Sequence, residues 1–323
     1  MKTGFSKSRL ISLADLFFAP FTYISALLLL KIRHVGVQRM YWSKKILMSV
    51  GVFPITDHYY EPMFNSRHLT KRLTENRCLP GIDLNVDEQL AILSRFDFSD
   101  ELVVFPLEKN GELQFHYHNT GVGPGDAEYL YNMIRLFKPR KILEIGSGNS
   151  TLMALNAIKQ NKEDDPDYVC QITCVEPYEN HWLEKLDVKV LREKVENLDK
   201  ELFRGLGTND ILFIDSTHII RPQGDVLFEY QEILPILRPG VIVHIHDIFT
   251  PKNYPEDWVS RRVIFWNEQY LLEAFLTFND KYKIIGALNY LKHNYFKELS
   301  DKCPVLKNEP DREPRSFWMV RVA

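Results

Sequence analysis

A glycine-bearing stretch, Lys138–Leu155 (KPRKILEIGSGNSTLMAL), constrains this chain more than any other part of its sequence. It predicts a short apolar strand over Ile142–Ile145, a turn at Gly146 and Gly148, and then a helix. Because glycine has no Cβ and tolerates positive φ, such a turn brings backbone N–H groups close to a ligand. Dinucleotide-binding turns carry a third glycine where this chain has Thr151, so a pyrophosphate ligand is disfavoured.

Beyond Lys141, apolar runs alternate with helical stretches, which predicts a mostly parallel sheet with helices on both faces. The fold class is therefore α/β, with a doubly wound seven-stranded sheet. Ligands bind such sheets beyond the carboxyl ends of the strands, so the residues after each strand are candidate site residues. The expected strands are Ile142–Ile145, Gln171–Val175, Val188–Leu191, Ile211–Ile214, Val241–Ile245, Tyr282–Leu288 and Ser316–Val322.

Glu176 follows the second of these strands, where a carboxylate can accept hydrogen bonds from both hydroxyls of a ribose. The alternative is an ordinary solvated loop glutamate. The pattern E-I-G-S-G-N-S-T resembles the first motif of class I S-adenosylmethionine (SAM) dependent methyltransferases, which have a Rossmann-like fold. The resemblance implies that SAM is the cofactor, and that its binding residues are Glu144, Gly146, Ser147, Gly148, Ser150, Thr151, Glu176 and Asp215.

Two neighbouring strands end in acids and histidines: Asp215 and His218 follow Ile211–Ile214, and His246 and Asp247 follow Val241–Ile245. Carboxylates and an imidazole that converge without basic partners attract a divalent cation, because unpaired charges in a pocket are costly. The arrangement resembles metal-dependent O-methyltransferases of the macrocin methyltransferase and cephalosporin hydroxylase type.

This second resemblance implies that Asp215, His246 and Asp247 hold a divalent metal and that His218 is the general base. His246 stands where that family has an acid. Imidazole is a poor magnesium ligand, so both magnesium and a softer transition metal stay open, as does His246 as the base. The predicted catalytic residues are therefore His218, His246 and Asp215.

A long segment after the fifth strand, Ile248–Leu272, is rich in prolines, tryptophans and arginines, which is typical of a lid or a substrate-recognition loop. With the preceding H-x-H-D, it resembles the methyltransferase type 24 group, over about Phe115–Arg321. The implied function is SAM-dependent methylation of a hydroxyl on a small molecule, a sugar or a lipid-linked saccharide. The alternatives are a non-catalytic SAM-fold subunit of a membrane or biosynthetic complex and a nicotinamide-dependent oxidoreductase.

The first 50 residues differ in composition from the remainder. They carry eight Lys and Arg against one acid, Asp15, and Leu16–Leu30 is uncharged. A hairpin kinked at Pro20 that rests on an anionic membrane surface is one interpretation. An N-terminal helix packed on its own domain or on a dimer partner is the other. Residues beyond 50 are acidic overall, which disfavours nucleic-acid binding.

Three regions are expected: a basic and apolar arm over 1–50, a connecting helical region over 51–114, and the methyltransferase domain over 115–323. The four cysteines form no CxxC pair and are typical of reduced thiols in the cytosol. The expected location is the cytoplasm, with the inner face of the membrane as an option through residues 1–50. A homo-oligomer also stays open.

Overall fold

The computed structural model describes residues 4–323, with side chains described from Ser8 onward. The start of the predicted basic arm, including Lys2, therefore lies outside the described residues. The chain divides into two compact units, Met1–Thr70 and Lys71–Ala323. Residues 71–114 of the expected connecting region thus belong to the second unit.

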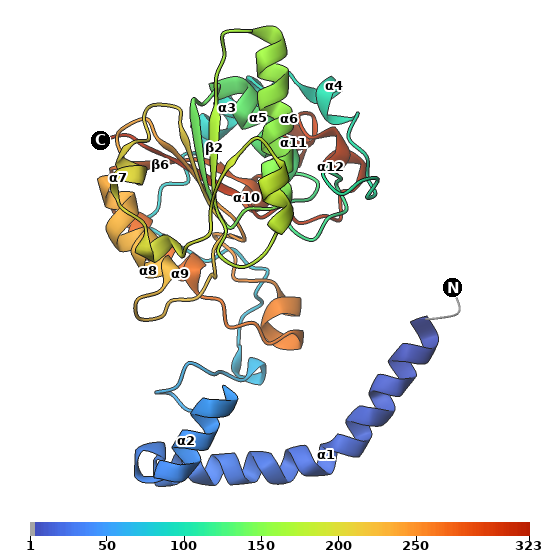
Figure 1. The fold of residues 1–323 in the computed structure, drawn as a ribbon, viewed down its shortest axis with the longest axis vertical. Helices are drawn as coiled ribbons and strands as arrows, with labels where there is room; N and C mark the ends of the chain where they lie inside the picture. The colour runs from blue at the N-terminus through green and yellow to red at the C-terminus, as the bar shows by residue number, and fades with distance from the viewer. Residues whose placement is uncertain (1–3) are drawn as a thin grey trace. The chain divides into compact units, whose positions relative to one another are not determined.

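The first unit is mainly helical, with α1 (Gly4–Val35), a 3-10 turn (Val37–Arg39), α2 (Tyr41–Val50) and a further 3-10 turn (Ser66–His68). The structure differs from the expected hairpin, because α1 continues through Pro20. Proline cannot donate to the carbonyl four residues earlier, and this weakens a helix locally. Figure 1 shows α1 changing direction along its length. The chain turns after α1 at Gly36, whose φ of 95° suits glycine.

The second unit is built on a seven-stranded sheet with the order β3-β2-β1-β4-β5-β7-β6. The five strands from β3 to β5 pair in parallel, whereas β7 is antiparallel to both of its neighbours. The predicted doubly wound, mostly parallel sheet is confirmed, and each predicted strand lies within a residue of its observed bounds. These are β1 (Lys141–Ile145), β2 (Gln171–Val175), β3 (Lys189–Leu191), β4 (Ile211–Ile214), β5 (Ile242–Ile245), β6 (Tyr282–Ala287) and β7 (Phe317–Arg321).

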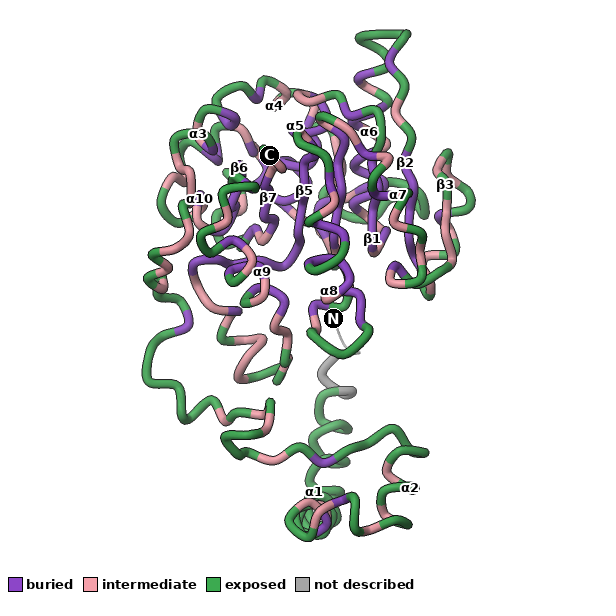
Figure 2. The backbone as a smooth tube through the Cα atoms, turned by 90° about the vertical axis from the view of Figure 1, so that its left-hand side faces the viewer, coloured by how far each residue is buried: buried purple, intermediate pink, exposed green. Residues whose placement is uncertain are grey.

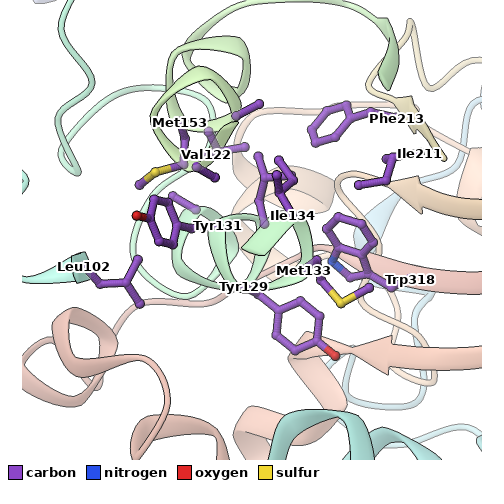
Figure 3. Close-up of a cluster of buried hydrophobic side chains, with 14 of the residues drawn as sticks. Leu102, Val122, Tyr129, Tyr131, Met133, Ile134, Met153, Ile211, Phe213 and Trp318 are labelled. Carbon is purple, nitrogen blue, oxygen red and sulfur yellow. The ribbon is translucent and has the colours of Figure 1, made fainter. Parts of the chain in front are cut away.

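Alternate residues of the strands feed two apolar cores, one on each face of the sheet. Ile142 of β1 and Phe213 of β4 enter the core beneath the helices α5 (Asp126–Phe137) and α6 (Asn149–Asp164). Figure 3 shows this core around Trp318. Their neighbours in the two strands, Leu143 and Leu212, enter the opposite core. Figure 2 shows the central strands buried along most of their length. Burial on both faces explains why these strands are continuous apolar runs in the sequence.

The helices of the second unit are mostly short. Their bounds are α3 (Val86–Ser94), α4 (Ser99–Leu102), α5 (Asp126–Phe137), α6 (Asn149–Asp164), α7 (Glu201–Arg204), α8 (Asp225–Phe228), α9 (Glu268–Leu276), α10 (Leu288–Asn294), α11 (Phe296–Ser300) and α12 (Pro304–Asn308). Single helical turns cover His181–Lys185, Val195–Asn197, Glu229–Ile233, Leu234–Ile236 and Asp257–Arg261.

Candidate functional site

The turn after β1 requires its first glycine. Gly146 has a φ of 76°, and a Cβ built on it would lie 1.9 Å from the carbonyl oxygen of Asp215. Any side chain here would push the end of β1 away from the end of β4. Gly148 stands directly before α6, so the first backbone N–H groups of that helix face the space above the turn.

Two adjoining hollows lie over this turn at the carboxyl ends of the strands. They share Gly146, Glu176 and Asp215, so they form one elongated groove. One part is lined by Ile145, Val175, Pro177, Tyr178, Lys194, Val195, Glu196, Ser216, Thr217, Arg221 and Asp225. The other is lined by Thr120, Gly121, Val122, Ser147, Gly148, Asn149, Ser150, Glu179 and Asn180. The loop before α5, which contains Gly121, Gly123 and Gly125, thus forms one wall of the groove.

Glu176 is buried at the middle of this groove. Its Oε1 accepts hydrogen bonds from the backbone N–H groups of Tyr178 and Glu179, at 3.0 and 2.9 Å. These two bonds fix the carboxylate by one oxygen. The geometry therefore leaves Oε2 as the atom that can accept hydrogen bonds from a ligand in the groove.

Glu144 and Thr151 line neither part of the groove. The Thr151 hydroxyl donates to Glu144 Oε2 beneath the turn, and both residues are buried. Burial raises the pKa of Glu144 to about 7, and hydrogen bonds from nearby hydroxyls oppose this effect. This pair connects β1 to the first turn of α6, so it supports the turn from behind.

The acids and histidines after β4 and β5 do converge. Asp215, His246 and Asp247 each offer a ligand atom, and these atoms lie within 4.8 Å of one another. His246 Nδ1 is 3.5 Å from Asp215 Oδ1 and 3.6 Å from Asp247 Oδ1. Burial lowers the pKa of His246, but the negative charges of Asp247 and Asp215 outweigh it and raise the pKa to about 10.

His218 stands over the same two carboxylates. Its Nε2 is 3.3 Å from Asp215 Oδ1 and 3.4 Å from Asp247 Oδ2, while its Nδ1 is 2.7 Å from Glu268 Oε2. The ring is buried, which lowers the pKa of His218. The hydrogen bonds to Asp215 and Glu268 outweigh burial and raise that pKa well above its usual value.

Three residues of this cluster escaped the sequence prediction: Asp126, Glu268 and Arg315. The guanidinium of Arg315 contacts Asp247, and Asp126 Oδ2 lies 3.8 Å from His246 Nε2. Glu268 begins α9, where it also accepts a hydrogen bond of 3.0 Å from the Tyr230 hydroxyl. None of the three directly follows a parallel strand, so their positions in the sequence do not indicate that they belong to the site.

The segment predicted as a lid contributes an aromatic cluster beside His218. The Trp266 ring lies 4.3 Å from the His218 ring, and the Trp258 ring lies 5.0 Å from Trp266 at 88°. The guanidinium groups of Arg262 and Arg315 lie over Trp258 at 5.7 and 5.5 Å. Flat apolar surfaces and arginine charges therefore stand next to the acid and histidine cluster.

A family of methyltransferase domains matches residues 143–248, which run from β1 to just after β5 and include the glycine turn, Glu176 and the cluster. Residues 143–248 are a SAM-dependent methyltransferase domain. The matched region contains most of the residues that line the groove, and also the three residues whose ligand atoms converge.

More distantly related proteins match this methyltransferase over a longer part of its chain than the domain family does. A protein of unassigned function from Archaeoglobus fulgidus is 30% identical over 174 residues, which make up 50% of this chain and 76% of the relative. The solved structures that resemble this chain include MycE, a methyltransferase of mycinamycin biosynthesis in complex with Mg, SAH and mycinamycin VI. That likeness has 22% identity and a TM-score of 0.27, and covers 38% of this chain and 32% of MycE.

Another similar structure is the O-methyltransferase TomG from Streptomyces achromogenes, in complex with SAM. It is 12% identical with a TM-score of 0.35, and the likeness covers 72% of this chain and 90% of TomG. These likenesses are low in both identity and TM-score. The assignment of the methyltransferase therefore rests on the domain family and on its glycine turn and acidic strand end.

Proposed function

We propose that this methyltransferase transfers the methyl group of SAM to a hydroxyl of a small molecule, a sugar or a lipid-linked saccharide. The observation that carries the proposal is the position of Asp215. It lines the groove and belongs to the cluster of acids and histidines. A ligand bound in the groove would therefore lie next to groups that can accept or donate a proton.

The adenosyl part of SAM would lie in the part of the groove lined by Tyr178, Lys194 and Glu196. The ribose hydroxyls would donate to Glu176 Oε2, and the methionine part would lie over Gly146 and the start of α6. Glu144 and Thr151 would act from behind, by supporting the turn. This placement suits the groove, because the backbone N–H groups at the start of α6 could bind the carboxylate of the methionine part of SAM.

His218 is the better placed general base of the two histidines. Glu268 accepts from Nδ1–H, so Nε2 is the ring atom that faces Asp215 and Asp247 and that can exchange a proton with a ligand there. In His246, Nδ1 is the ring atom that faces both carboxylates, and its lone pair could bind a metal ion held between them. We therefore assign the base to His218 and a ligand role to His246.

The donor set fits a divalent cation. Donor atoms held about 2.1 Å from one ion lie about 3.0–3.5 Å apart, and the distances from His246 Nδ1 to Asp215 and Asp247 are 3.5 and 3.6 Å. One imidazole and two carboxylates favour a transition ion such as Mn²⁺ or Zn²⁺ over Mg²⁺. Such an ion would acidify a hydroxyl bound next to it.

The chain's own residues would supply the remaining parts of the mechanism. The methyl carbon of SAM is already electrophilic, so the protein has to hold an acceptor oxygen in line and take its proton. Trp258 and Trp266 would hold the acceptor, and His218 would take the proton on Nε2. The carboxylates of Asp215 and Glu268 raise the pKa of His218, and a cation that neutralised Asp215 would lower it.

The acceptor can be found by comparing metabolites from cells with and without the gene, and searching for a species lighter by one methyl group. Purified enzyme with SAM should methylate that species. EDTA should abolish turnover, and Mn²⁺ or Zn²⁺ should restore it. An unchanged rate in EDTA would refute the metal assignment and leave the two acids as groups that orient the histidines.

Glu268 gives a sharper test of the base. Glu268→Gln should lower kcat at least about tenfold without raising KM for SAM, because the amide no longer holds His218 in one tautomer. Glu268→Asp should recover part of the rate. If no lighter metabolite exists and no SAM turnover is measured, the non-catalytic SAM-fold subunit becomes the better account.

A further inference from the structure

The long N-terminal helix α1 presents apolar side chains to the solvent on every side. Every residue from Ser8 to Leu28 is exposed, including the consecutive Leu16, Phe17 and Phe18 at 73, 66 and 57%. Consecutive residues point about 100° apart, so these three alone cover most of the circumference. Figure 2 shows α1 exposed along nearly its whole described length.

This distribution argues against a protein partner. A helix that packs on its own domain or on a second copy needs one apolar stripe and keeps polar residues elsewhere. A helix that lies flat on a membrane surface likewise needs a polar face. Between Leu10 and Leu30 the sole charged residue is Asp15, so α1 has neither arrangement.

The length of α1 matches a bilayer. Its segment Ser8–Val35 has a mean hydropathy of 1.8 in its most apolar window, and none of that window is buried in the described structure. The 21 residues from Leu10 to Leu30 would extend about 31 Å, close to the hydrocarbon thickness of about 30 Å. Asp15 lies one to two turns inside the N-terminal end of this segment.

The residues after α1 suit the membrane boundary. Lys31, Arg33, Arg39, Lys44 and Lys45 follow the apolar segment, against Lys2, Lys7 and Arg9 before it. Tyr41 and Trp42 of α2 are 65 and 70% exposed, and Lys45 Nζ lies 5.7 Å from the centre of the Trp42 ring. Aromatic and basic residues gather where a membrane helix meets water, with the larger basic cluster on the cytoplasmic side.

We propose that α1 crosses a lipid bilayer once, with α2 at the interface on the cytoplasmic side and the N-terminal end of α1 on the opposite side. This goes beyond a surface-bound arm, and it stands whether or not the methyl-transfer proposal holds. The continuous helix through Pro20 supports one crossing, because a re-entrant hairpin needs a break inside the apolar run.

Protease protection can test this topology. The full chain, with one epitope tag before Met1 and another after Ala323, is synthesised with vesicles of phosphatidylethanolamine and phosphatidylglycerol. External protease should remove the C-terminal tag and spare the N-terminal one until detergent is added. The protein should also stay with the vesicles in alkaline carbonate.

The variant Ile24→Arg with Leu28→Arg places two charges within the apolar segment and should be released by carbonate. Its matched control, Ile24→Leu with Leu28→Ile, keeps the hydropathy and should stay. The melting temperature of the second unit should be equal in both variants, which excludes a folding defect. Removal of both tags by external protease, extraction of the unchanged protein by carbonate, or cellular protein that lacks α1 would each overturn the proposal.

Discussion

Loss of the Glu176 carboxylate should weaken SAM binding more than any other single change in the groove that leaves the fold intact. The carboxylate is buried, and two backbone N–H groups already occupy Oε1. Oε2 would accept from the ribose. A hydrogen bond to a charged group contributes about 1.5–3 kcal/mol, so Glu176→Ala should raise the Kd roughly 10- to 150-fold.

A second substitution separates the two oxygens. In Glu176→Gln the amide oxygen can still accept from the Tyr178 and Glu179 N–H groups, while the NH₂ replaces the ligand-facing oxygen. The charge is lost but the loop stays in place, so we expect a Kd increase of about 3- to 10-fold.

Titration calorimetry with SAH measures these affinities without an acceptor. Asp187→Ala is the control, since it removes an exposed charge between β2 and β3 at a residue that does not line the groove. Its Kd should change by less than about twofold. If Glu176→Ala binds SAH as tightly as the unchanged protein, the ribose does not lie on this carboxylate and our placement of the cofactor is wrong.

Other substitutions test the turn, the cluster and the strand beneath them. Gly146→Ala should destabilise the fold by more than about 2 kcal/mol in urea unfolding, because the new Cβ would collide with the Asp215 carbonyl at a positive φ. Asp247→Asn should abolish turnover and calorimetric Mn²⁺ binding but change SAH affinity less than about threefold, since Asp247 lines neither part of the groove. Burial raises the pKa of Glu144 from 4.5 to about 7, so its contribution to stability is fully present below pH 4.5 and is lost as the pH rises toward 7. Glu144→Gln should therefore gain stability relative to the unchanged protein between these pH values, and equal stability differences at pH 4.5 and 7 would contradict this.

The sheet could be predicted from the sequence because its parallel strands are buried on both faces and appear as continuous apolar runs. The residues after these strands meet at one edge, so Glu176, Asp215 and Asp247 were found from order alone. Glu144 could not be placed in the same way. The side chains of Glu144 and Leu143 point to opposite faces of β1, and the sequence alone does not show which of these faces is nearer to the ligand.

The missed residues have a different cause. Glu268 reaches the cluster through the position of α9, and Arg315 through the pairing of β7 with β5. They lie about 50 and 70 residues beyond the residues that they contact, His218 and Asp247. The sequence also did not predict that α1 continues through Pro20, because proline disfavours a helix locally while the apolar residues around it favour one.

The antiparallel strand β7 has a consequence for the order in which the protein can form. It follows the other six strands in the chain, yet it lies between β5 and β6, and the backbone N–H groups of Arg315 and Ser316 donate to Asp126 at 2.8 and 2.7 Å. A nascent chain that has been synthesised only as far as α12 therefore has an incomplete sheet and lacks both hydrogen bonds to Asp126. Because α1 is synthesised before all seven strands, this apolar helix is exposed to its surroundings while the cluster of acids and histidines is still incomplete.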